Sequence, residues 1–152
     1  MNNVYSVEVT PQDTNLINFT HGWHSELEGD LHSNYRWSVE LDAAIQIPKI
    51  SSSPLRKGLI HLELDAIPYT STRGPSHQDV IICLDGSIVA GIRLHKGEVK
   101  SFNGMFANPI NYSSFSEIRF FLPHCARPSI LGDGTDERDL GIALRKLKIE
   151  LS

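Results

Sequence analysis

The chain has 152 residues, a formal net charge of −4, 40% hydrophobic residues and 21% charged residues. This length fits one ordinary domain, and the composition is typical of a soluble globular protein rather than a disordered or fibrous one. The acidic balance and the lack of a basic run exclude a strongly charged nucleic-acid-binding surface, and no apolar run approaches the ~20 residues of a membrane helix.

Two further features bear on the compartment. The N-terminus has neither the positive nor the apolar region of a signal peptide. The only two cysteines, Cys83 and Cys125, both lie in apolar stretches that resemble strands, which favours buried free thiols and a reducing environment. We therefore expect a cytoplasmic protein that does not insert into a membrane.

The first half of the chain predicts three strands. Val4 to Thr10 alternates and ends at Pro11. From Trp37 to Ile47 every odd position is apolar, which predicts one long half-buried strand with Ser38, Glu40 and Asp42 on its wet face. Residues 59–66 alternate in the same way, with the even positions inward.

The second half predicts a hairpin and three more strands. Val80 to Leu84 is apolar throughout, as in a strand covered on both faces, and Asp85-Gly86 is a strong hairpin turn. The return strand is expected over residues 88–94, with Ile88, Ala90, Ile92 and Leu94 inward. Lys96-Gly97 turns the chain into a strand at 98–102, residues 102–114 form a loop, and 117–122 form another strand.

The last stretch is expected to close the fold. Leu140, Ile142 and Leu144 place one face of a strand in the core, and Leu147, Ile149 and Leu151 continue one step out of phase. A phase slip inside a strand indicates a β-bulge. We expect this strand to lie in the middle of a sheet.

About eight strands are expected, with no convincing helical period and turn signals roughly every 8–12 residues. Long connections mixed with hairpins favour jelly-roll or Greek-key topology. The prediction is an all-β fold, a two-sheet antiparallel β-sandwich forming a single domain over residues 1–152.

An ordered set of short motifs runs through the chain: Gly22-Trp23 with Glu28, Arg36-Trp37-Ser38, Arg127-Pro128, Leu131-Gly132, and Asp136 to Leu144. This set resembles the β-sandwich modules of bacterial surface-polysaccharide proteins, which are commonly attached to glycosyltransferases and look like carbohydrate-binding jelly rolls. The resemblance covers residues 22–151. It implies a sandwich, saccharide binding and a glycosyltransferase as a possible partner.

Aromatic side chains in loops are candidates for stacking on a sugar ring. Trp23 lies in a loop and is either such a platform or a packing lid, whereas Trp37 falls on the apolar side of its strand and is expected in the core. Tyr69 and Phe106, both expected in loops, are weaker candidates of the same kind.

Charged residues from distant parts of the sequence supply the rest of the candidate site. We expect Glu28, Arg36, Asp133, Asp136 and Arg138 to converge, either on sugar hydroxyls or as an ion-pair network that holds the Trp23 loop and the last turn against the sheet. With three carboxylates around it, a buried Arg138 would be the hub, and Arg138→Ala would then cost several kcal/mol.

Metal and catalytic sites are weakly supported. The oxygen-rich loop at 133–139 leaves a structural calcium ion open, although Arg138 would repel it. His21, His24 and His32 do not have zinc-ligand spacing, and no nucleophile elbow or phosphate-binding glycine loop occurs. Glu26 and Glu28 are the only hint of glycoside cleavage.

The sequence thus predicts a non-catalytic saccharide-binding module without a cofactor. Its expected ligand-binding residues are Trp23, Glu28, Arg36, Tyr69, Asp136 and Arg138. The alternative is a docking or oligomerisation domain with no ligand of its own. A broad apolar patch would favour that alternative, whereas a wet face at Ser38, Glu40 and Asp42 beside a groove at Trp23 would favour sugar binding.

Overall fold

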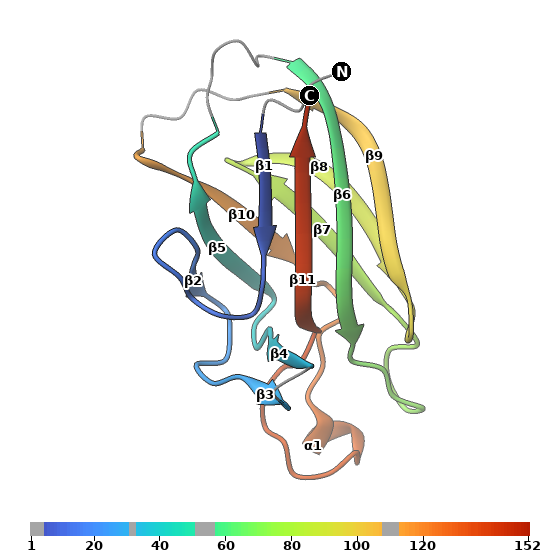
Figure 1. The fold of residues 1–152 in the computed structure, drawn as a ribbon. Coiled ribbons are helices and arrows are strands. Elements are labelled where there is room, and N and C mark those ends of the chain that lie inside the picture. The colour runs from blue at the N-terminus through green and yellow to red at the C-terminus, as the bar shows by residue number, and fades with distance from the viewer. Residues whose placement is uncertain (1–4, 31–32, 51–56, 108–112) are drawn as a thin grey trace.

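The computed structural model describes residues 5–30, 33–50, 57–107 and 113–152. Two antiparallel sheets face each other across one hydrophobic core (Figure 1). The prediction of an all-β two-sheet sandwich is therefore confirmed. Among the described residues the only helix is α1 (Pro128–Leu131), and no helix is long and apolar enough to cross a membrane.

The first sheet has the order β3-β4-β11-β6-β9, and β1 also pairs with β11. Its strands are β1 (Tyr5–Val9), β3 (Glu28–Gly29), β4 (Asn34–Trp37), β6 (Lys57–Pro68), β9 (Val99–Ala107) and β11 (Ile142–Leu151). The second sheet has the order β2-β5-β10-β7-β8. Its strands are β2 (Asn18–His21), β5 (Asp42–Pro48), β7 (Gln78–Leu84), β8 (Ser87–Leu94) and β10 (Phe115–Phe121).

The last strand behaves as predicted. β11 lies between β6 on one side and β4 and β1 on the other (Figure 1). Its pairing with β6 shifts between Leu144 and Lys146, and the apolar residues before and after this bulge are all buried. The extra residue is what allows both halves of the strand to face the same core.

The long strand predicted over residues 37–47 is wrong, because the chain crosses there from one sheet to the other. β4 ends at Trp37 in the first sheet, and β5 begins at Asp42 in the second. Within the crossing, Ser38 is fully buried rather than wet, and Leu41 is 59% exposed. The Ser38 hydroxyl accepts a hydrogen bond from the Ile142 amide at 2.9 Å, and this bond explains how a polar residue fits there.

Two other local predictions need correction. β9 continues to Ala107, so Phe106 is a buried strand residue, 2% exposed, and not a loop platform. In the predicted hairpin, Asp85 and Gly86 have the expected positive φ values of 46° and 86°. A register shift beside this turn leaves Ile88 exposed and buries Val89 in its place.

Candidate functional site

A polar cluster formed by β3 and the loop before β11 contains several of the predicted ligand-binding residues. The Arg138 guanidinium donates to both carboxylate oxygens of Asp136, at 2.7 Å through Nη2, and to Glu28 Oε2 at 3.1 Å. These hydrogen bonds raise the pKa of Arg138 and lower that of Asp136. The Arg138 side chain is 26% exposed, so the cluster lies at the surface and Arg138 is not a buried hub.

The three carboxylates expected around Arg138 have separate partners. Asp139 pairs with Arg127, with Nε to Oδ1 at 3.1 Å. Asp133 accepts a 2.6 Å hydrogen bond from the Tyr69 hydroxyl. Burial, followed by this bond, raises the pKa of Tyr69 to about 12, so the hydroxyl remains a donor at neutral pH. Of these three carboxylates, only Asp136 pairs with Arg138, and a structural calcium ion at this loop stays a prediction.

Arg36 has other hydrogen-bond partners than the residues of this cluster and holds the Trp23 loop, as in the structural alternative. Its guanidinium donates to the carbonyl oxygens of Pro11 at 2.9 Å and His24 at 2.8 Å, and it stacks on the Phe19 ring at 4.6 Å. The residue is 6% exposed. Arg36 therefore does not converge with Arg138, and its hydrogen-bonding capacity is used within the protein.

Trp23 follows the packing alternative, whereas Trp37 differs from expectation. Trp23 packs edge-on against Phe19 and Phe120, and its indole N–H donates to the Ala44 carbonyl at 3.1 Å. Trp37, expected in the core, is half-buried and contacts the Tyr35 ring. Trp23 still lines a shallow hollow of about 300 Å³ beside Arg36, but its ring is used mainly for packing.

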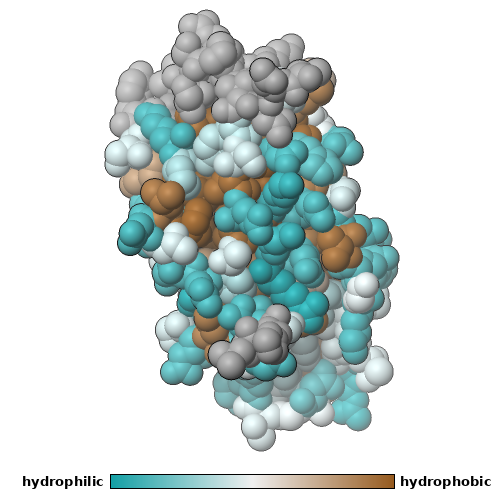
Figure 2. All heavy atoms as spheres, viewed as in Figure 1, coloured by the Kyte–Doolittle hydropathy of each residue, from teal (hydrophilic) through white to brown (hydrophobic). Residues whose placement is uncertain are grey.

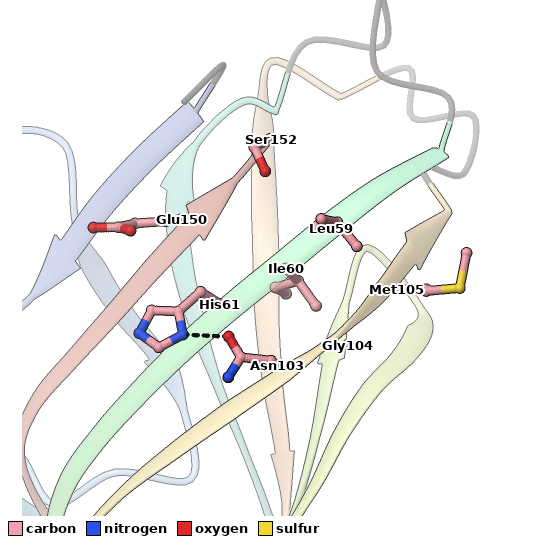
Figure 3. Close-up of a pocket in the computed structure, with 8 residues that line it drawn as sticks. All are labelled: Leu59, Ile60, His61, Asn103, Gly104, Met105, Glu150 and Ser152. Atoms are coloured by element: carbon pink, nitrogen blue, oxygen red, sulfur yellow. Dashed lines mark hydrogen bonds between the residues drawn. The ribbon is translucent and has the colours of Figure 1, made fainter. Parts of the chain in front are cut away.

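A different hollow, which the sequence analysis did not identify, lies on the outer face of the first sheet. It measures about 400 Å³, and its eight lining residues come from β6, β9 and the end of the chain (Figure 3). These residues are Leu59, Ile60, His61, Asn103, Gly104, Met105, Glu150 and Ser152.

The strand register arranges these side chains in two rows. His61 lies opposite Glu150 on one side and Asn103 on the other, and its Nδ1 is 2.7 Å from the Asn103 Oδ1 (Figure 3). In the next row Leu59 lies opposite Met105, and these side chains are 52% and 67% exposed. A polar row beside an exposed apolar row can bind a ligand that has both hydroxyl groups and C–H surfaces.

The outward positions of β6 were visible in the sequence as polar residues on an alternating strand. What the sequence did not contain was the pairing of β6 with both β9 and β11. Asn103 and Glu150 were assigned to a loop and to a terminal strand, so nothing placed them beside His61.

Two groups of described residues bring metal-ligating atoms together: His77, Asp79 and His124, and separately His21, Glu40 and Asp42. His24 contacts the backbone of Glu26 instead, and His32 lies outside the described residues.

No protein-family model and no curated protein sequence matches the chain. Several solved structures, however, match the chain in fold. A family 35 carbohydrate-binding module from Clostridium thermocellum has a TM-score of 0.56 at 10% identity, over 95% of this chain and 98% of that one. The C-terminal family 6 module of LamC from Zobellia galactanivorans has 0.53 at 6% identity, over 96% and 99%. The CBM22-1 xylan-binding domain of Xyn10C from Paenibacillus barcinonensis has 0.52 at 8% identity, over 95% and 92%.

The chain shares the β-sandwich fold of these carbohydrate-binding modules. This agrees with the fold implied by the sequence resemblance. At 6–10% identity the likeness concerns the fold and does not identify a ligand.

Proposed function

We propose that the chain is a non-catalytic saccharide-binding module whose binding surface is the hollow on the outer face of the first sheet. The observation that carries the proposal is the pair of rows around His61 and Leu59. A sugar ring could place its C–H face on Leu59 and Met105 while its hydroxyls bond to His61, Asn103 and Glu150. The similarity in fold to carbohydrate-binding modules supports this reading.

The hollow is open, and none of the described residues that line it is a phenylalanine, tyrosine or tryptophan. We therefore expect weak binding of a chain-like or terminal sugar rather than tight enclosure of a small molecule. His61 and Asn103 already bond to each other, so a sugar hydroxyl would join this pair or replace one partner.

The sequence motifs also bear on the pathway and the partner enzyme of this protein. The sequence motifs resemble modules that accompany glycosyltransferases, so we propose a role in bacterial polysaccharide synthesis beside such an enzyme. The two free cysteines support a cytoplasmic location.

A glycan array with the purified protein, run with calcium and again with a chelator, tests the proposal. We expect binding to a defined saccharide that His61→Ala and Asn103→Ala each weaken by about tenfold or more, since each removes hydrogen bonds to the ligand. Both side chains are on the surface, so circular dichroism should show unchanged folding.

Tyr69→Phe is the matched control, because it removes one hydroxyl from the polar cluster at the other site. If Tyr69→Phe weakened binding and the two sheet variants did not, the saccharide would bind at the cluster of Glu28, Asp136 and Arg138. Loss of binding in the chelator alone would indicate a calcium-dependent site.

Docking to a protein partner is the second candidate function. Hydrophobic residues gather on the viewed face over β1 and β5 (Figure 2). Leu16, just before β2, is 68% exposed. An array without any binding, together with concentration-dependent self-association or capture of a glycosyltransferase that Leu16→Asp abolishes, would favour docking.

A further inference from the structure

Three side chains meet at the end of the second sheet where β7 begins. Asp79 lies on β7, His77 just precedes this strand, and His124 follows β10. The His124 Nε2 is 2.9 Å from Asp79 Oδ2, and the His77 Nε2 is 3.6 Å from Asp79 Oδ1. One ligand atom from each of the three residues lies within 4.8 Å of the other two.

The ring nitrogen of His77 that faces this group has no hydrogen-bond partner although it is buried. Its distance to Asp79 is within ion-pair range but too long for a hydrogen bond. The other ring nitrogen, Nδ1, is 3.1 Å from the Ser76 hydroxyl. An outer contact of this kind fixes the ring so that Nε2 points inward, as in metal sites.

His124 is also held in place from behind. The fully buried Gln78 side chain donates to the His124 carbonyl at 3.2 Å and to the Tyr69 carbonyl at 2.8 Å. Gln78 lies between His77 and Asp79 in the sequence. Its hydrogen bond to the His124 carbonyl therefore fixes the start of β7 relative to the turn after β10. The three side chains are therefore positioned before any ion binds.

The distances fit a small borderline cation. Zinc binds histidine nitrogen and carboxylate oxygen at 2.0–2.2 Å in tetrahedral geometry, so neighbouring ligand atoms are about 3.4 Å apart. His124 Nε2 lies 2.9 Å from one Asp79 oxygen and His77 Nε2 lies 3.6 Å from the other, so the two histidines approach the same carboxylate within the range that one ion can bridge. Imidazole ligands favour zinc or a similar transition metal over calcium or magnesium.

We propose that His77 Nε2, His124 Nε2 and the Asp79 carboxylate form a binding site for Zn²⁺ or a similar transition-metal ion. The bound ion would join the start of β7 to the turn after β10, and its remaining coordination position would be open to water or a ligand. The proposal is independent of saccharide binding, because the hollow at His61 lies on the other sheet.

Two further charged or titratable groups face the site. Arg93 on β8 donates to both oxygens of Asp79, through Nε to Oδ1 at 2.9 Å and through Nη2 to Oδ2 at 3.2 Å. The His95 ring lies 5.6 Å from that of His77. The Arg93 side chain is 60% exposed, so a bound ion would displace one of its two hydrogen bonds to the Asp79 carboxylate. Its positive charge nevertheless repels a bound cation. Removing Arg93 should therefore tighten metal binding, whereas removing a ligand should weaken it.

The second group of possible ligands is a poorer site. Its one histidine nitrogen, His21 Nε2, already lies 3.0 Å from Glu40 and 3.2 Å from Asp42, whereas the first group has His77 Nε2 without a hydrogen-bond partner. An arginine pairs with the aspartate in both groups. His21→Ala is therefore the matched control for His77→Ala, since each removes one histidine from a group with acidic neighbours.

The test is a calorimetric titration of the tag-free protein with Zn²⁺, repeated with Co²⁺ and followed by visible absorption. We expect one site, with His77→Ala, His124→Ala and Asp79→Asn each weakening affinity by about 100-fold or more, because loss of even an outer contact costs 10- to 100-fold. Arg93→Gln should tighten Zn²⁺ binding by on the order of tenfold at low salt.

Zinc should also raise the melting temperature of the wild type and of His21→Ala, but not of Asp79→Asn. Zinc binding that survives His77→Ala and His124→Ala unchanged, or that is lost in His21→Ala, would overturn the proposal. So would weaker binding in Arg93→Gln, since it would mean that Arg93 holds the ligands rather than opposing the ion.

Discussion

Arg36 and Arg138 look alike in the sequence, and each was expected in the same cluster. In the structure Arg36 is 6% exposed and donates to backbone carbonyls, whereas the Arg138 side chain is 26% exposed and pairs with carboxylates. This difference in burial and in partners should separate their contributions to stability.

We expect Arg36→Ala to lower the free energy of unfolding by about 3 kcal/mol, because buried carbonyl oxygens lose their donors. Arg138→Ala should cost only about 1 kcal/mol, as for a partly exposed ion pair. Urea denaturation of both variants measures the difference. If Arg138→Ala were the more costly of the two, Arg138 would be the hub that the sequence predicted.

The burial of Trp23 and Trp37 does not follow from their neighbours in the sequence. Their sequence neighbours assign one to a loop and the other to a strand, yet the loop residue packs on the core and the strand residue is half-buried. Burial of a loop aromatic depends on which distant residues lie beneath it, in this case Phe19 and Phe120. No local pattern contains this information.

The crossing between β4 and β5 depends on a close approach of two chain segments. Gly22 has a φ of +76°, and a Cβ atom there would lie 2.1 Å from the Asp42 carbonyl oxygen. The Val39 amide donates to the Gly22 carbonyl at 2.8 Å, which holds the crossing segment against the Trp23 loop. Only glycine fits this position.

Gly22→Ala should therefore destabilise the fold by more than about 2 kcal/mol, because both backbone strain and a clash result. Gly91 is the matched control on β8, where no atom lies within 4 Å of an added Cβ. Gly91→Ala should leave stability unchanged or raise it by about 0.5 kcal/mol. Thermal denaturation of the two variants is the measurement, and similar melting temperatures would contradict the close approach.

The molecule as a whole should be sensitive to acid. The pKa values of Asp79 and Asp136 are lowered because each carboxylate accepts hydrogen bonds from an arginine, Arg93 and Arg138 respectively. A folded-state pKa below the unfolded value of about 3.9 means that the stabilisation is present above that pH and is lost as pH falls through the folded value.

We expect the melting temperature, measured with a chelator present, to be nearly constant from pH 7 to about pH 5 and to fall below about pH 4. Asp136→Asn should melt lower than the wild type at pH 7, and the gap should narrow in acid as Asp136 of the wild type becomes protonated. A gap that stays constant down to pH 2 would show that ionised Asp136 does not stabilise the fold.

The sequence alone determined the fold class and the elements with strong local signals. The alternation in residues 59–66, the Asp85-Gly86 turn and the bulge near Leu144 were all predicted, because each depends on a side-chain period or on a backbone conformation encoded within a few residues. Of the five charged residues expected to converge, three do so, since Arg138 contacts both Glu28 and Asp136.

Only the tertiary structure decided which strands become neighbours, and with them the candidate sites. His61, Asn103 and Glu150 share one face because β6 pairs with β9 and β11, and His77, Asp79 and His124 meet because β7 lies beside β10. The strand ends at Trp37 because β4 pairs with β11 in the first sheet, whereas β5 pairs with β10 and β2 in the second. In an antiparallel sandwich the register between distant strands is fixed by packing of the whole core, so no local period in the sequence reveals it.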